Sequence, residues 1–241
     1  MSKLQRVEGK FKELSEILNE ELHNVSSFFE KVTGKKPQGV GVDFSENGIQ
    51  RVYWDPVQEK LVFNLVSYQI KPADTSIFAK LKRHLSHNDI TEMHMQMRRE
   101  LAISFFISQY NYKHALDGQL RSDMDGLEIL LHDHFLSEIA ELFATVYVSK
   151  DKTRYDIQEE EQKFFRKIEE KTNFEKQSFI DFYKSNCTDG WLSPESLARL
   201  FSKAVINKAI EAGKDYKWII TEFFNKGPEA FLEEIAKESK Q

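Results

Sequence analysis

The stretch Leu4–Val32, LQRVEGKFKELSEILNEELHNVSSFFEKV, decides the fold of the first part of this protein. Large apolar residues recur in it at intervals of three and four, which places their side chains along one side of an α-helix. They are Leu4, Val7, Phe11, Leu14, Leu18, Leu22, Val25, Phe29 and Val32. The intervals alternate strictly up to Leu18, and a repeated interval of four then interrupts the heptad pattern. Gly34 and Pro37 predict the end of this long helix.

An apolar stripe this narrow is typical of a helix that packs against another helix. Packing within its own domain and an intermolecular coiled coil are the two outcomes that the pattern allows. The strictly alternating part of the stripe is the candidate interface. It consists of Leu4, Val7, Phe11, Leu14 and Leu18. We expect a protein partner or a second copy of the chain to bind there.

After this helix the apolar period changes to two, which indicates β-strands. Strands are predicted in GVGVDF (39–44), IQRVYW (49–54) and KLVFNLVSYQI (60–70). Glu46-Asn47-Gly48 and Asp55-Pro56 are turn signals between them. The pattern predicts a three-stranded antiparallel meander. A sheet this small needs a cover on one face, and we expect the N-terminal helix to provide it.

The sequence after Pro72 reads as helical throughout. Helices are predicted near 74–85, 88–112, 124–149, 153–171, 174–185, 193–212, 215–225 and 228–239. Ser193-Pro194 is a helix start, and Gly213 and Gly227 are helix ends. The fold class is therefore α+β and mainly helical, with a helix and meander over 1–72 and a helical bundle over 73–241. A weaker subdivision is predicted near residue 150.

The composition limits the classes of function. The 241 residues include 19 Phe but only 5 Pro and 10 Gly, which favours long helices over turn-rich β structure. The net charge of −5 gives no general attraction to nucleic acid, so such binding needs a local basic patch. The densest basic group is Lys80, Lys82, Arg83, Arg98 and Arg99. The single Cys187 excludes an intramolecular disulfide, and the absence of a signal-like or membrane-spanning stretch indicates a cytoplasmic protein.

One segment of the bundle is unusually rich in charge. DKTRYDIQEEEQKFFRKIEEK (151–171) has a thin apolar stripe of Ile157, Phe164 and Ile168. A charge run of this kind is typical of a solvated helix face.

The stretch LEILLHDHFL (127–136) places histidines and carboxylates inside an apolar run. On a helical wheel Leu131, Phe135, Ile139, Leu142 and Val146 form one stripe, with Glu128 inside it and His132 on its shoulder. Asp133 points to the opposite side. A carboxylate one turn before a histidine either forms a structural pair with it or contributes half of a metal site.

Leu130-Leu131-His132-Asp133 resembles the LLHD of HD-domain phosphohydrolases, which are helical and bind metal through histidines and aspartates. The resemblance implies metal ligands at His94, His132, Asp133 and Asp181. With Glu128, which lies one turn before His132, the candidate metal set is His94, Glu128, His132, Asp133 and Asp181, and Glu128, His132 and Asp133 are the candidate catalytic residues. The sequence departs from that family after the dipeptide, where His134-Phe135 replaces small residues.

Gln69-Ile70-Lys71, which follows the third predicted strand, resembles the metal-site motif of PD-(D/E)xK nucleases. Such a site also needs an aspartate nearby. In the predicted meander Asp55 lies at the far end of the same strand pair, more than ~30 Å from Lys71. Asp43 lies two strands over, and the point on the third strand with which it aligns is about 25 Å from Lys71. The meander therefore disfavours a nuclease site.

These observations favour a non-enzymatic intracellular interaction or regulatory protein that acts through amphipathic helical surfaces, without a cofactor. A metal-dependent phosphohydrolase or nuclease centred on Glu128, His132 and Asp133 is the alternative. A nucleic-acid accessory factor that uses the basic residues near 80–99 is the second alternative.

Overall fold

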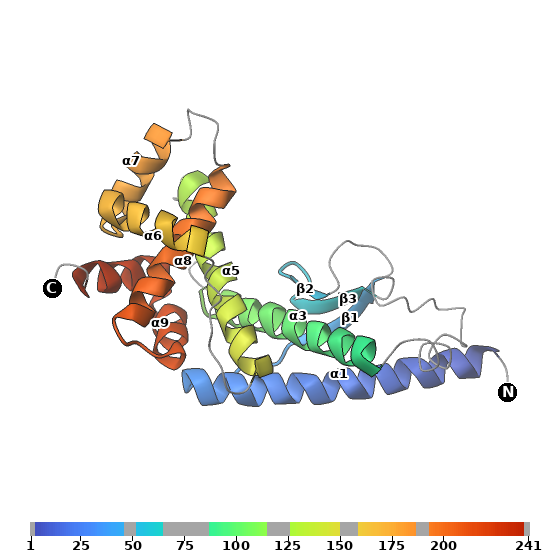
Figure 1. Cartoon of the computed structure of the whole chain (residues 1–241). Helices are drawn as coiled ribbons and strands as arrows, with labels where there is room; N and C mark the ends of the chain where they lie inside the picture. Colours follow the sequence, from blue (N-terminus) through green and yellow to red (C-terminus); the bar gives the residue numbers. More distant parts are fainter. Residues whose placement is uncertain are drawn as a thin grey trace. The chain divides into compact units, whose positions relative to one another are not determined.

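The computed structural model describes residues 3–45, 52–64, 87–114, 126–149, 159–186 and 193–238. Within these ranges the chain forms seven helices and a three-stranded sheet (Figure 1), which confirms an α+β, mainly helical protein. Its contacts divide it into two compact units, Met1–Tyr112 and Lys113–Gln241. The domain boundaries predicted at 72/73 and near 150 lie outside the described ranges and stay predictions, as does the helix at 74–85.

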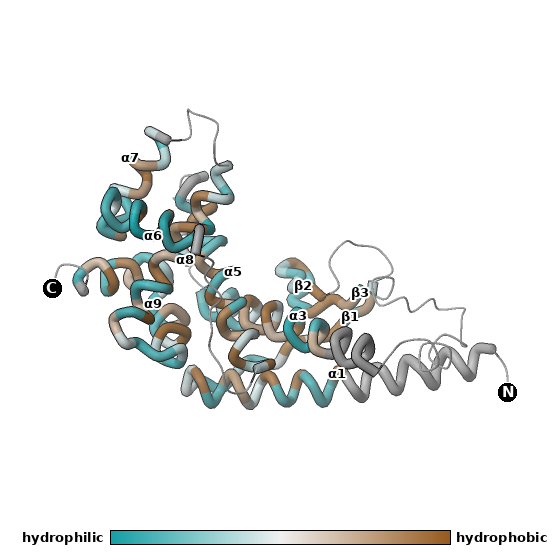
Figure 2. The backbone as a smooth tube through the Cα atoms, viewed as in Figure 1, coloured by the Kyte–Doolittle hydropathy of each residue, from teal (hydrophilic) through white to brown (hydrophobic). Residues whose placement is uncertain are grey.

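The first unit contains two long helices that run in the same direction. They are α1 (Lys3–Thr33), which ends just before Gly34 as predicted, and α3 (His87–His114). The Arg98 Nε donates to Glu21 at 3.0 Å. Further along, the Phe29 ring lies 5.9 Å from that of Phe105 and 6.2 Å from that of Phe106. The second contact lies later in the sequence than the first on both helices, so α1 and α3 are parallel neighbours. Figure 2 shows hydrophilic and hydrophobic residues alternating along the second half of α1, as expected for a helix with one buried side.

The sheet consists of β1 (Gly41–Ser45), β2 (Val52–Asp55) and β3 (Lys60–Asn64). The prediction of an antiparallel meander is wrong in one respect. The strand order is β1-β3-β2, with β2 antiparallel and β1 parallel to β3. The chain reverses between consecutive strands as the turn signals predict, but β1 pairs with the third strand and not with the second.

The apolar content of β3 explains this order. Leu61, Val62 and Phe63 are consecutive and all buried, which requires cover on both faces of the strand. A central strand also has both edges paired. The four residues of β2 are only partly buried beyond Val52, and β1 is half-buried or exposed along its length, so these strands take the edges.

The cover of the sheet comes from α3. The Ser104 hydroxyl donates to the carbonyl of Val52 at 3.3 Å, and the Trp54 ring lies 5.3 Å from that of Tyr112 in an edge-on contact. Within this unit α3 therefore lies between the sheet and α1 (Figure 1). The sequence predicted that α1 covers the sheet, but the contacts come from α3, which begins more than fifty residues after α1 ends.

The second unit is a bundle of α5 (Gly126–Ser149), α6 (Glu159–Thr172), α7 (Lys176–Asn186), α8 (Pro194–Glu211) and α9 (Tyr216–Glu238). The helix α8 contacts α5, α6 and α9. Its Phe201 ring lies 6.1 Å from Phe135 of α5, 6.3 Å from Phe174 and 4.2 Å from Phe179 of α7. All four rings are fully buried. The abundance of phenylalanine is thus used to join the helices of this unit.

Local signals in the sequence set the helix ends of this unit. Ser193 caps α8 by accepting from the amide of Ser196, and Pro194 takes the first turn. The helix closes at Gly213, whose φ of +81° lets Lys214 donate its amide to the carbonyl of Ala209. In α9, Gly227 has φ +81° and ψ 178°, so two helical segments meet there at a kink, as predicted. None of the helices in the described part of the chain has the length and apolar content needed to cross a bilayer.

The contact between α1 and α3 predicts a large cost for removing Phe29. Phe29 is 1% exposed, so Phe29→Ala leaves a cavity beside two phenylalanine rings and should lower the free energy of unfolding by about 3–5 kcal/mol. Chemical denaturation followed by circular dichroism measures this. Glu30→Ala, which changes the exposed residue next to Phe29, is the control and should change the free energy of unfolding by less than ~0.5 kcal/mol. Equal small effects would show that this part of α1 is not core.

Candidate functional site

The apolar stripe of α5 is buried as the helical wheel predicts. The side chain of Asp133 is 51% exposed, in agreement with its predicted outward direction, and that of His132 is 14% exposed. The His132 Nδ1 lies 3.3 Å from the Asp133 Oδ1. The histidine thus lies beside the exposed aspartate at the bundle surface.

The Glu128 carboxylate takes part in an ion pair that the sequence did not reveal. The Lys176 ammonium, at the start of α7, lies 2.6 Å from Glu128 of α5 and 2.5 Å from Glu229 of α9. Three helices are therefore joined by one lysine between two carboxylates. This arrangement gives the carboxylate inside the apolar stripe a charged partner.

The surroundings of Lys176 act on its pKa in opposite directions. Burial disfavours the charged ammonium, but the hydrogen bonds and charges of Glu128 and Glu229 outweigh this, and the pKa is raised. The ammonium is therefore held in its charged form. We call this group of Lys176, Glu128 and Glu229 the clamp, because it links three helices.

The residues proposed for a metal site do not converge in the described part of the chain. No group of three or more His, Cys, Asp or Glu side chains there is arranged to hold an ion. Asp181 is exposed on α7 and accepts from Gln177 at 3.1 Å. The His94 side chain lies outside the described set, as does Gln69-Ile70-Lys71. The phosphohydrolase alternative therefore stays a prediction.

The altered strand order bears on the nuclease alternative. Asp43 lies on the strand next to β3 and not two strands away, and it pairs in register with Val62. Its Oδ2 accepts from the Lys60 ammonium at 3.2 Å. Lys71 lies outside the described ranges, so its distance from Asp43 is not tested and the nuclease alternative stays a prediction.

The basic residues near 80–99 are partly described. The Arg98 guanidinium forms the ion pair with Glu21 that joins α1 to α3, so it serves the fold of the first unit. Lys80, Lys82 and Arg83 lie outside the described ranges. The nucleic-acid alternative rests on these residues and stays a prediction.

The register of α1 against α3 locates the candidate interface. The offset is 77 residues from Glu21 to Arg98 and 76 from Phe29 to Phe105. With this offset Leu18 is level with residues 94–95, and it is buried, 1% exposed. Phe11 and Leu14 are level with the first described turn of α3, whereas Leu4 and Val7 are level with positions before its first described residue, His87. The backbone of α1 is helical over all of these positions.

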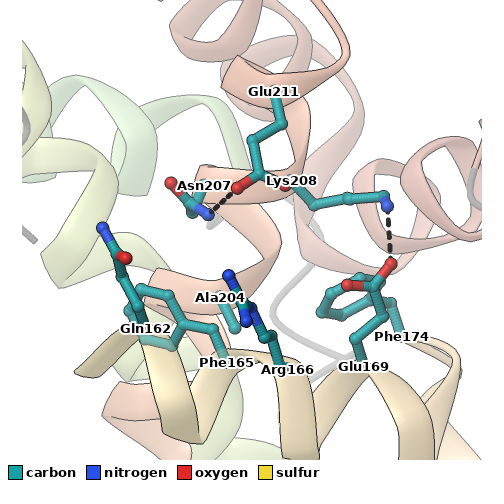
Figure 3. A pocket seen from close by; sticks show the side chains of 9 residues that line it. All are labelled: Gln162, Phe165, Arg166, Glu169, Phe174, Ala204, Asn207, Lys208 and Glu211. Carbon is teal, nitrogen blue, oxygen red and sulfur yellow. Dashed lines mark hydrogen bonds and ion pairs between the residues drawn. The ribbon is translucent and has the colours of Figure 1, made fainter. Parts of the chain in front are cut away.

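A hollow opens between α6 and α8 in the second unit (Figure 3). It encloses about 280 Å³. Its exposed surface is mainly polar, and Phe165, Phe174 and Ala204 lie behind that surface, at most 5% exposed. On its polar side the Lys208 ammonium pairs with Glu169 at 2.5 Å, and the Asn207 amide donates to Glu211 at 2.9 Å.

The turn beneath the hollow has an uncommon backbone. Asn173 and Phe174 have φ of +45° and +57°, a region that residues with a large side chain rarely occupy. The amide of Phe174 donates to the Thr172 hydroxyl at 3.1 Å, while its ring packs on Phe201. These contacts hold the Phe174 ring in the core of the second unit, where it is 1% exposed.

Comparison with known proteins identifies no relative, since no family model, curated protein or solved structure matches this chain. Lys176 gave no signal in the sequence, because its two partners are 48 and 53 positions away. In the charge-rich segment the sequence singled out Phe164, which is 43% exposed, and missed its neighbour Phe165, which is buried.

The clamp predicts a specific loss of stability. Lys176→Met keeps most of the apolar stem but leaves two carboxylates without their shared cation, so the free energy of unfolding should fall by about 1–2 kcal/mol. Lys184→Met, exposed at the end of the same helix, is the matched control and should be nearly neutral.

The raised pKa also fixes how this loss depends on pH. The stability that Lys176 adds is fully present below its ordinary pKa of 10.5 and disappears as the pH rises through the raised value. The difference between wild type and Lys176→Met should therefore be constant from neutral pH to about 10 and then shrink. A difference that grows above pH 10 would contradict the clamp.

Proposed function

We propose that this protein is a non-enzymatic interaction or regulatory protein whose first helix associates with the same helix of a second copy. The observation that carries the proposal is the register of α1 against α3. Leu18 is buried in the first unit, and the same apolar stripe continues to Leu4, beyond the start of α3. An apolar spacing that continues beyond the first described residue of α3 supports the proposal, because heptad spacing of this kind is typical of a coiled coil.

The helix is long enough for both roles. Its 31 residues span about 46 Å at 1.5 Å per residue. The described contacts with α3 use the half from Glu21 onward. Because the folded half fixes the helix, the first half loses less conformational entropy on association than a free peptide would.

Charge favours a second copy in parallel orientation. If Leu4 and Val7 take the a and d positions of a heptad, Lys3 and Lys10 take g and Glu8 takes e. In a parallel pair each g residue faces the e residue of the next heptad, which places Lys3 opposite Glu8 of the other chain. In an antiparallel pair the g positions face one another, which places lysine against lysine.

Two charges placed on the apolar stripe test the association. Leu4→Asp with Val7→Asp should weaken it by on the order of 100-fold, because carboxylates at a and d positions lose their hydration without a partner. Sedimentation velocity over a range of concentrations should show the wild-type mass rising above 28.3 kDa and the variant staying at that value. The variant should stay folded, with the circular dichroism spectrum of the wild type.

The matched control adds the same two charges outside the stripe. Gln5→Asp with Asn19→Asp occupies two b positions and should associate as the wild type does. A wild type that is monomeric at every concentration would overturn the proposal. Unfolding of the Leu4, Val7 double variant would also overturn it, since those residues would then be core of their own chain.

A cross-link tests the orientation. In a parallel pair Val7 of one chain faces Val7 of the other, within the Cα separation that a disulfide allows. In a Cys187→Ser background, Val7→Cys should oxidise rapidly to a covalent dimer on a non-reducing gel, and Gln5→Cys should not. A dimer that sediments as such but cross-links at neither position would point to an antiparallel pair and contradict the proposed orientation.

A further inference from the structure

The helix α6 separates its charges between two sides. On the side toward α8, Glu161 accepts from the Lys203 ammonium at 2.8 Å, and Glu169 accepts from the Lys208 ammonium at 2.5 Å. Figure 3 shows Glu169 directed from α6 to Lys208 of α8. Because these two carboxylates are engaged with another helix, they do not neutralise the lysines of α6 itself. The outer side of α6 is therefore left with positive charge.

The outer side of α6 carries three lysines in one line. Lys163, Lys167 and Lys171 follow one another at intervals of four residues, so they lie within about 80° around the helix and along about 12 Å of its length. All three are exposed. Within the described part of the chain none of them takes part in an ion pair. We call this line the lysine row.

The lysine row works against the stability of its own helix, because like charges four residues apart on a helix repel each other. Other lysines of the second unit are used differently. Lys176, Lys203 and Lys208 each lie within 2.8 Å of a carboxylate on another helix. In the row the exposed Glu170 lies only at the edge. The row thus concentrates positive charge in a chain whose net charge is −5, and such a local field attracts an acidic partner.

An exposed aromatic ring lies beside the lysine row. Phe164 is 43% exposed, whereas the next residue, Phe165, is 5% exposed in the core of the unit. Phe164 lies three residues before Lys167, so its side chain lies along the flank of the row. Aromatic side chains are enriched where proteins contact one another. The surface therefore offers one apolar contact beside three positive charges.

The dimensions of this surface fit a helix better than a nucleic acid or a membrane. Carboxylates at intervals of four residues on another helix repeat every ~6 Å, as the lysines do. Proteins that hold DNA through its phosphates neutralise about 6–10 of them, and three lysines supply half of that or less. Helices that lie on membranes insert an apolar face, but the apolar side of α6, with Phe165 and Ile168, is buried in the core.

We propose that the outer side of α6 binds an acidic helix of a partner protein, with carboxylates at four-residue intervals on the lysine row and an apolar side chain against Phe164. Complementary charges around a small apolar contact favour rapid and specific encounter, as a regulatory interaction requires. This surface belongs to the second unit and is independent of association through α1, so the two proposals can fail separately.

A synthetic helical peptide tests the proposal. The probe has glutamates at three positions four residues apart with a leucine beside them, and its control has glutamines in place of the glutamates. Fluorescence anisotropy of the labelled peptides at low ionic strength should show the glutamate peptide binding at least about tenfold more tightly, because only its side chains form charge-assisted hydrogen bonds. Equal affinities, or no binding of either peptide, would overturn the proposal.

Variants of the surface locate the binding. Lys163→Gln with Lys167→Gln and Lys171→Gln should lower the affinity for the glutamate peptide by at least about tenfold, and Phe164→Ala by at least about threefold. These residues are exposed, so both variants should keep the circular dichroism spectrum of the wild type. The sedimentation behaviour should also be unchanged, since α1 is intact. A fall in mass in the triple variant would assign the surface to a second copy and contradict the proposal.

The matched control removes the same charge elsewhere in the second unit. Lys184→Gln with Lys217→Gln and Lys237→Gln changes three exposed lysines of α7 and α9 and should leave the affinity unchanged. An equal loss in both triple variants would show a general charge effect and no site. A single-stranded oligonucleotide and vesicles of anionic phospholipid are tested in parallel. Tighter binding of either, lost only with the lysine row, would assign the surface to a phosphate-bearing partner and overturn the proposal.

Discussion

The ring of Phe201 is the contact on which the helical unit depends. It touches Phe135 on α5, Phe174 in the turn after α6 and Phe179 on α7, while its own helix contacts α9. Because fully buried rings make many close contacts at once, their packing fixes the spacing between helices better than smaller apolar side chains do. The strained turn at Phe174 persists because this cluster holds its ring in place.

Charged residues serve the helical unit mainly as links between helices. Lys176 joins three helices through two carboxylates, Lys203 joins α8 to Glu161 of α6 at 2.8 Å, and Arg199 joins it to the buried Glu138 of α5 at 2.9 Å. In a chain that is 30% charged, these ion pairs give several charged side chains a structural role. Arg166 differs from these residues, since its guanidinium lies beside a cavity.

The sequence predicted helices well and side-chain neighbours poorly. The spacing from Leu4 to Val32, the cap at Ser193 and the kink at Gly227 are local signals, and each was confirmed because it depends on residues within one or two helical turns. The choice between Phe164 and Phe165 failed for the opposite reason. Both fit the period of α6, and only the position of α8 decides which ring is buried.

The sequence by itself determined the fold class, the position of the helices and the reversal of the chain between strands. Tertiary structure alone decided that β3 is central, because its consecutive buried residues need cover on both sides. It also decided that α3 packs against the sheet, and that Glu128 pairs with Lys176. Each of these depends on residues brought together from distant parts of the chain. Their pairing is set by the competition for burial and for opposite charge in the folded state, which no local spacing records.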